Sequence, residues 1–163
     1  MTAIIRRFAA PVVFACAALL AGPAFASVQT GTVEVSVNLL PTCVVQTTNM
    51  NFGTYTSSEP IDDLSTANVT TTCSLLTAFT IGLDAGMNAD GANRRMADGA
   101  GNFIRYTVAR DVARTQLLRP VVDLVPLVGT GLPQVTQLYG SIPANQNVPP
   151  GAYTDRITVT VDF

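Results

Sequence analysis

The side chains that carry most enzyme chemistry are missing from this sequence. It contains no histidine and no tryptophan, and all nine of its basic residues are arginine. These absences exclude a nucleophile activated by histidine, an imidazole metal site, a Schiff-base lysine and a phosphate-binding loop of the kind that needs a lysine. We therefore expect no catalytic residue, no metal and no cofactor, and predict that the protein is not an enzyme.

Two short motifs resemble functional loops but are typical of surface turns. Residues 86–91 read Gly-x-Asn-x-Asp-Gly, half of a calcium loop, but glycine holds the first ligand position and Ala97 the closing one. Asp62 and Asp63 could be paired carboxylates for acid-base chemistry, yet neighbours in an extended chain point to opposite sides. The sequence thus predicts a turn at residues 86–91 and a solvated loop around Asp62 and Asp63.

The first 26 residues have the pattern of a secretory signal peptide. Arg6 and Arg7 precede an apolar run over residues 8–21, and Ala-Phe-Ala at residues 24–26 predicts cleavage after Ala26. The run is too short for a membrane span, which needs about 20 apolar residues, so we expect Sec export and no stable membrane anchor. Removing 26 of the 163 residues leaves 137, with seven arginines against eleven acids. That balance argues against a nucleic-acid partner.

The mature chain keeps two of the three cysteines, Cys43 and Cys73, because Cys16 lies in the predicted signal peptide. An even number of cysteines in an exported protein favours a disulfide. A bridge across 30 residues is worth about 3–4 kcal/mol in the chain-entropy model. The alternative of a metal or redox site lacks both the CxxC spacing and a nearby histidine.

The mature chain has the alternating pattern of β-strands. The full sequence is 48% hydrophobic and 12% charged, and a chain of this length and composition is expected to fold as one domain. Further β-like runs cover residues 50–55, 67–74, 78–83, 102–110 and 135–142, and no helical period is sustained beyond one possible turn at 111–118. Residues 117–131 are predicted to be either a long loop or an irregular edge strand. The pattern predicts an all-β antiparallel sandwich of immunoglobulin-like type.

The two clearest alternating segments lie at opposite ends of the mature chain. Residues 32–40 place Val33, Val35, Val37 and Leu39 on one face, and the last segment does the same with Ile157, Val159, Val161 and Phe163. Each segment exposes a β-edge that needs a partner. They are either ordinary first and last strands, or the first strand is donated to a neighbouring molecule and lies beside that molecule's last strand in an open groove.

At this point the sequence resembles a known family, the spore coat protein U domain family, which includes the subunits of archaic (Csu-type) chaperone-usher pili. The resemblance covers nearly all of the mature chain. It is carried by the order and spacing of eight segments, at residues 30–33 leading to Cys43, 50–55 (Met-Asn-Phe-Gly-Thr-Tyr), 69–73, 80–86 (Thr-Ile-Gly-Leu-Asp-Ala-Gly), 93–96 (Asn-Arg-Arg-Met), 102–106 (Asn-Phe-Ile-Arg-Tyr), 138–143 and 151–163. Residues 117–131 depart from the family, which tends to carry a Trp-Gly pair there.

The resemblance implies a structural subunit of a surface pilus that supports adhesion and biofilm formation. It implies six core strands in an immunoglobulin-like fold that lacks its seventh, within residues 43–163, and a donor-strand extension at residues 27–42. The expected partners are a periplasmic chaperone, an outer-membrane usher and neighbouring pilin subunits. The expected location is the periplasm and then the cell surface.

Three alternatives remain at the level of the sequence. A spore or cyst coat protein would use the same fold in a different assembly. A small periplasmic binding protein is disfavoured because no convergent polar cluster is visible. A tip adhesin would need a second, receptor-binding domain, for which the chain is short.

Overall fold

The computed structural model describes residues 26–163, so the predicted signal peptide, apart from Ala26, lies outside the described residues. Residues 38–163 form one compact unit, and within residues 26–163 all regular structure is β-strand, with no helix long and apolar enough to cross a membrane. The strands are β1 (Cys43–Thr47), β2 (Asp63–Cys73), β3 (Ala78–Leu83), β4 (Arg94–Ala97), β5 (Phe103–Ala109), β6 (Val125–Val128), β7 (Gln134–Ile142) and β8 (Val159–Asp162).

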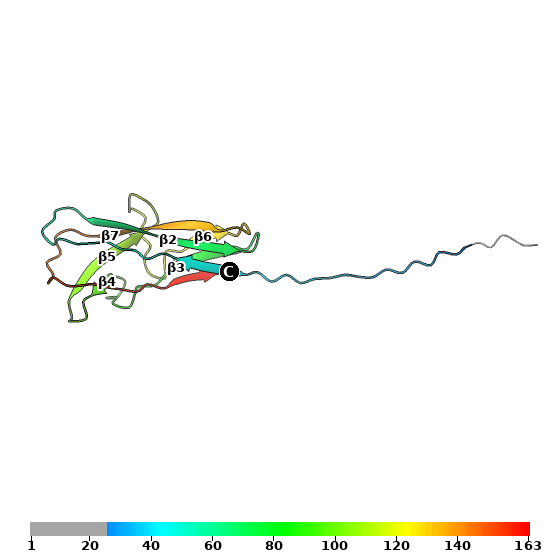
Figure 1. Ribbon diagram of the computed structural model, residues 1–163, viewed down its shortest axis with the longest axis horizontal. Coiled ribbons are helices and arrows are strands. Elements are labelled where there is room, and N and C mark those ends of the chain that lie inside the picture. Colours follow the sequence, from blue (N-terminus) through cyan, green and yellow to red (C-terminus); the bar gives the residue numbers. More distant parts are fainter. Residues whose placement is uncertain (1–25) are drawn as a thin grey trace, which may run out of the picture. The chain divides into compact units, whose positions relative to one another are not determined.

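The strands form two antiparallel sheets (Figure 1). One sheet has five strands in the order β1-β2-β7-β5-β4, and the other has three in the order β6-β3-β8. The chain ends just after β8, which is drawn in red beside the C-terminal mark. The predicted all-β, immunoglobulin-like sandwich is therefore confirmed. Within the described residues, β1 and β4 are the edge strands of the larger sheet, and β6 and β8 are the edge strands of the smaller one.

Alternation along the longest strand explains how the core forms. On β2 every second side chain, from Ala67 through Val69 and Thr71 to Cys73, is buried against the opposite sheet. Ile81 and Leu83 of β3 belong to the same core from the other layer, and Val108, Leu138 and Ile142 join it from β5 and β7, which lie in the same sheet as β2. Burial of one face of each sheet supplies most of the stabilisation of a sandwich, since alternate residues point to the same side.

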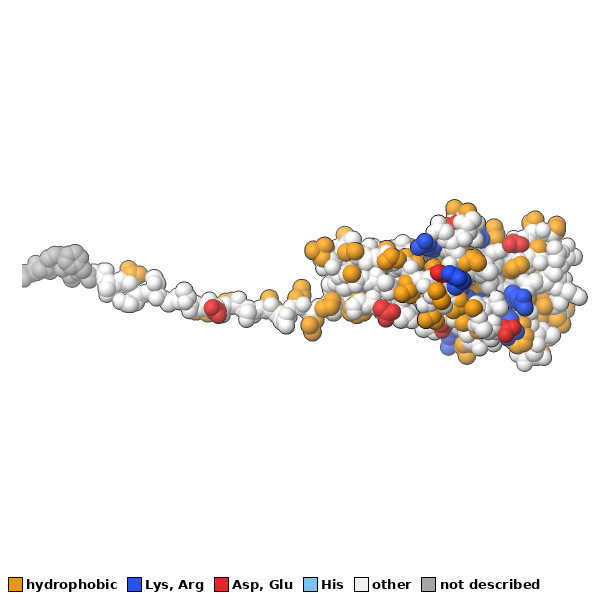
Figure 2. All heavy atoms as spheres, turned by 180° about the vertical axis from the view of Figure 1, so that it is seen from behind, with side chains coloured by type: hydrophobic (Ala, Val, Ile, Leu, Met, Phe, Trp, Pro, Cys, Tyr) orange, Lys and Arg blue, Asp and Glu red, His pale blue; other side chains and the backbone are white. Residues whose placement is uncertain are grey.

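Many large apolar side chains of the domain are exposed. On the face seen in Figure 2, hydrophobic side chains reach the surface over much of the domain, and arginine and acidic side chains are mixed between them.

The predicted strand at residues 50–55 is wrong. This segment has no ladder, and instead Met50 and Phe52 fold over β7 at Gly140, where a Cβ atom would collide with the Met50 sulfur and lie 2.7 Å from the Phe52 ring. The alternation at residues 50–55 arises because their apolar side chains pack onto the sheet, although their backbone forms no hydrogen bonds within its ladder.

β1 and β4 were not predicted as strands. Residues 111–118 form turns in place of a helical turn.

Residues 117–131 contain the edge strand that was one of the two predicted alternatives. β6 lies at the edge of the three-stranded sheet and pairs only with β3, with Pro126 opposite Thr80. Proline is tolerated there because an edge strand needs hydrogen-bond donors on one side only.

Replacing Thr71 with valine should leave the protein as stable as before or more stable by about 1 kcal/mol. Thr71 is fully buried, and its hydroxyl has no hydrogen-bond partner within the described chain. Valine keeps the shape and removes the unpaired polar atom. Ser141→Ala is the matched control, because the buried Ser141 hydroxyl donates to Asp62 at 3.0 Å and its loss should destabilise. Urea midpoints of both variants test this; a lower midpoint for Thr71→Val would contradict it.

Candidate functional site

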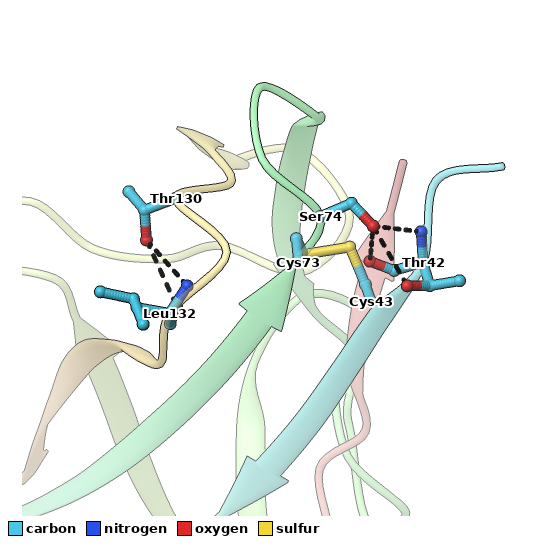
Figure 3. Close-up of a disulfide and its surroundings, with 6 residues drawn as sticks. All are labelled: Thr42, Cys43, Cys73, Ser74, Thr130 and Leu132. Atoms are coloured by element: carbon cyan, nitrogen blue, oxygen red, sulfur yellow. Dashed lines mark hydrogen bonds between the residues drawn. A yellow bond between two sulfur atoms is a disulfide. The ribbon is translucent and has the colours of Figure 1, made fainter. Parts of the chain in front are cut away.

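The disulfide predicted between Cys43 and Cys73 is present in the structure. Figure 3 shows it joining the start of β1 to the end of β2, where the two cysteines are opposite one another in the ladder. Next to it Thr42 N donates to the Ser74 hydroxyl at 3.0 Å, and Ser74 N donates to the Thr42 carbonyl at 2.9 Å. The bridge and these bonds hold β1 onto the edge of the larger sheet.

The last segment presents its apolar side chains inward, as its alternation predicts. Ile157, Val159 and Val161 are half-buried against the core, whereas Thr158, Thr160 and Asp162 are exposed. Phe163 follows the end of β8 and is 58% exposed. β8 pairs with β3, with Val161 opposite Ile81, and no other strand of residues 26–163 pairs with its second edge.

A groove of about 750 Å³ lies beside the free edge of this last segment. Its floor comes from the larger sheet and its walls come from the segment after β1 and the segment that leads into β8. It is lined by residues 47–52, 67–69 and 153–157 and by Met96, Tyr106, Leu138 and Val159. Most of the apolar members are only partly buried, so a segment laid in the groove would remove them from water.

Asp155 anchors the wall of the groove to the core. Its carboxylate accepts hydrogen bonds from the Tyr106 hydroxyl at 2.6 Å and from the backbone and side-chain amides of Asn88 at 3.1 Å. Burial raises the pKa of Tyr106, and its hydrogen bond to Asp155 raises it further, so Tyr106 stays a donor at any physiological pH. Gly86 is left-handed, with φ 85°, and a Cβ there would collide with the Asp155 carboxylate.

The buried side chain of Arg94 connects three segments of the domain near the groove. It is 4% exposed, and its guanidinium donates to the Asp84 carbonyl at 2.9 Å and to the Leu118 carbonyl. Burial lowers the pKa of Arg94, and the fields of Tyr106, Asp84 and Asp155 oppose that shift. The guanidinium therefore connects the start of β4 to the segment just after β3 and to the loop after β5.

These anchoring residues were not predicted as functional. Arg94 and Asp155 both lie in segments that carry the family resemblance, at residues 93–96 and 151–163, so the signal was present without a stated role. Only the fold brings them near one another, because 61 positions of sequence separate them.

The predicted donor residues Val33, Val35, Val37 and Leu39 lie in a segment without assigned strand, residues 26–42. Their side chains are exposed, Val35 by 91%, and Figure 2 shows apolar side chains uncovered along this segment. A β-strand is defined by backbone hydrogen bonds to a partner strand. A single chain that offers this segment no partner therefore contains it without an assigned strand.

Residues 87–88 and 91–92 are turns, as expected for the motif at 86–91, and Asp90 and Asn93 exchange two backbone hydrogen bonds across the second turn. Asp62 lies in the loop before β2, where it accepts from the Ser141 hydroxyl and the Ala144 amide, whereas Asp63 is already the first residue of β2. Among residues 26–163 no three acidic, cysteine or histidine side chains gather as a metal site would require.

The comparison with protein families decides the classification. The Spore Coat Protein U domain matches residues 29–160 of the chain. The chain belongs to this family. It is 32% identical to Protein U of Myxococcus xanthus over 175 residues, which cover 96% of this chain and 98% of that protein.

The fold of this Spore Coat Protein U domain protein is also found among solved structures. One is the CsuC–CsuE complex of a chaperone with a tip adhesion subunit, from the archaic chaperone-usher Csu pili of Acinetobacter baumannii. The similarity has a TM-score of 0.58 at 22% identity and covers 76% of this chain. It spans 40% of the matched chain, so it establishes the shared fold alone.

Proposed function

We propose that this protein is a structural subunit of a chaperone-usher surface pilus that polymerises by donor-strand exchange. The observation that carries the proposal is the groove, with its partly buried apolar side chains, beside the unpaired edge of the last segment. The donor is the extension at residues 27–42, and the accepting domain is residues 43–163. The pilus supports adhesion and biofilm formation.

The donor strand lies beside the last segment of a second copy. Val33, Val35, Val37 and Leu39 point into the groove beside that segment, while Glu34, Ser36 and Asn38 stay in water. Burying four aliphatic side chains contributes roughly 1.5–3 kcal/mol each, and the backbone ladder adds to this. The joint is therefore strong without a covalent link.

The direction of the donor strand follows from the topology. The extension leaves the domain at the start of β1, and β8 finishes at the same end of the domain. The reason is that β1 is antiparallel to β2, β8 is antiparallel to β3, and the turn between β2 and β3 lies at that end. In a linear chain of copies, each acceptor's own extension leaves at this end, so the donated extension must pass from the groove to its own domain at the opposite end of the acceptor. The donor strand therefore runs antiparallel to β8.

The partners follow from the empty groove. A subunit whose groove is unfilled exposes apolar surface and aggregates, so a periplasmic chaperone occupies the groove after Sec export. An outer-membrane usher then exchanges the chaperone for the extension of the next subunit, and the fibre emerges at the cell surface.

Expression of the mature chain in the periplasm tests the proposal. Without a partner we expect aggregation, degradation or self-polymerisation; with a cognate chaperone we expect a soluble one-to-one complex, measured by size-exclusion chromatography with light scattering. A stable monomer that keeps residues 27–42 unpaired would overturn donor-strand exchange.

A coat protein of the same fold is the second candidate. The family description and the full-length similarity to Protein U favour it. Immunogold electron microscopy separates the two functions, because a pilus subunit labels thin fibres and a coat protein labels a continuous layer around the cell.

A further inference from the structure

The edge that can accept a strand is longer than β8. Thr154 exchanges two backbone hydrogen bonds of 2.9 Å with Ala97, the Arg156 carbonyl accepts from Met87 at 3.1 Å, and the Thr158 carbonyl accepts from Asp84 at 3.1 Å. The backbone groups of the even-numbered residues therefore form their hydrogen bonds on one side of the segment from Thr154 to Thr158. In an antiparallel ladder, alternate residues form hydrogen bonds with the strand on one side and the strand on the other.

The odd-numbered residues of the same segment are free to pair. Within residues 26–163 the backbone groups of Tyr153, Asp155 and Ile157 form no hydrogen bond. The accepting edge thus begins at Tyr153, six residues before β8 begins at Val159.

The groove lies along the first part of this edge. Tyr153, Asp155, Ile157 and Val159 line it, and Val161 and Phe163 do not. Two antiparallel registers keep the donor face inward. In the terminal register, Val33 is opposite Phe163 and Leu39 opposite Ile157. In the groove register, Val33 is opposite Val159 and Leu39 opposite Tyr153.

Charges on the wet face distinguish the two registers. The terminal register places Glu34 directly opposite Asp162, and like charges in opposite positions destabilise a sheet. Thr80 of β3 is the residue opposite Asp162 on the other side and brings no positive charge. The groove register places Glu34 opposite Thr158 and diagonal to Arg156, the arginine of the accepting edge.

The groove register also buries no unpaired carboxylate beneath Val37. Val37 would cover Asp155, whose carboxylate already accepts bonds from Tyr106 and Asn88. Gly31 would face Val161, which lies outside the groove and needs no large side chain above it.

We propose that the donor strand binds in the groove register, so that Tyr153 and Asp155 belong to the acceptor site and Phe163 does not face the four apolar donor residues. This inference rests on the proposed donor-strand exchange. In this register Leu39 is opposite Tyr153, Val37 is opposite Asp155, Val35 is opposite Ile157 and Val33 is opposite Val159.

Paired cysteines on the wet face test the register in fibres of the full chain. Ser36 is opposite Arg156 in the groove register and opposite Thr160 in the terminal register, and these non-hydrogen-bonded pairs have Cα atoms about 4.5 Å apart. We expect Ser36→Cys with Arg156→Cys to give a ladder of cross-linked subunits on a non-reducing gel, and Ser36→Cys with Thr160→Cys to give none. A ladder from the second pair, or from neither pair in intact fibres, overturns the register. Absence of fibres from the wild-type chain overturns the proposed function itself.

A charge variant gives an independent readout. Glu34→Gln removes attraction to Arg156 in the groove register and removes repulsion from Asp162 in the terminal register. We expect subunits to dissociate from Glu34→Gln fibres about two- to fivefold faster at low salt. Slower dissociation would overturn the proposal.

Discussion

Replacing Val35 with aspartate will abolish assembly of the mature protein into fibres. Val35 is 91% exposed in the free chain, so the substitution leaves the folded domain unaffected. In the proposed joint the same position faces the groove, where a carboxylate has no partner. Burying an unpaired charge costs several kcal/mol, more than one valine contributes, and lowers the population of joined subunits by at least a thousandfold. Electron microscopy after shear release measures the fibre yield.

Asn38→Asp is the matched control for this result. It introduces the same carboxylate on the same segment, but at a position on the wet face of the donor strand. We expect normal fibre yield from this variant. Equal yields from Val35→Asp and Asn38→Asp would show that the segment is not inserted and that its alternation serves another purpose.

Removing the disulfide with Cys43→Ser and Cys73→Ser will destabilise the domain by about 3–4 kcal/mol. The bridge closes a loop of 30 residues, and without it β1, an edge strand of five residues, is held by β2 and the Thr42–Ser74 contacts alone. Because β1 leads into one wall of the groove, we also expect poorer chaperone capture. Tyrosine fluorescence in urea gives the loss of stability, since the chain has four tyrosines and no tryptophan.

Cys16→Ser is the control for the cysteine variants. Cys16 lies in the predicted signal peptide, so the mature protein should be unchanged. Two free thiols in wild-type periplasmic material under non-reducing conditions would contradict the disulfide as a feature of the exported protein.

The sequence by itself determined the class of the fold and the polarity of its strands. A period of two in β2, β3, β5, β7 and the last segment reports which face of each is apolar, because successive side chains of a strand point to opposite sides. Lack of histidine and lysine excluded whole classes of chemistry, and the even cysteine count indicated the bridge between Cys43 and Cys73.

The tertiary structure alone decided which edges stay open and where the groove lies. Alternation does not encode a hydrogen-bond partner, so residues 50–55 have a strand-like pattern but pack over Gly140 outside the ladder. The short strands β4 and β6 are fixed mainly by their neighbours β5 and β3. The anchoring of Asp155 by Tyr106 and Asn88 joins residues about 50 and 67 positions apart. Such contacts exist only once the chain has folded, because they depend on which distant segments the two sheets bring together.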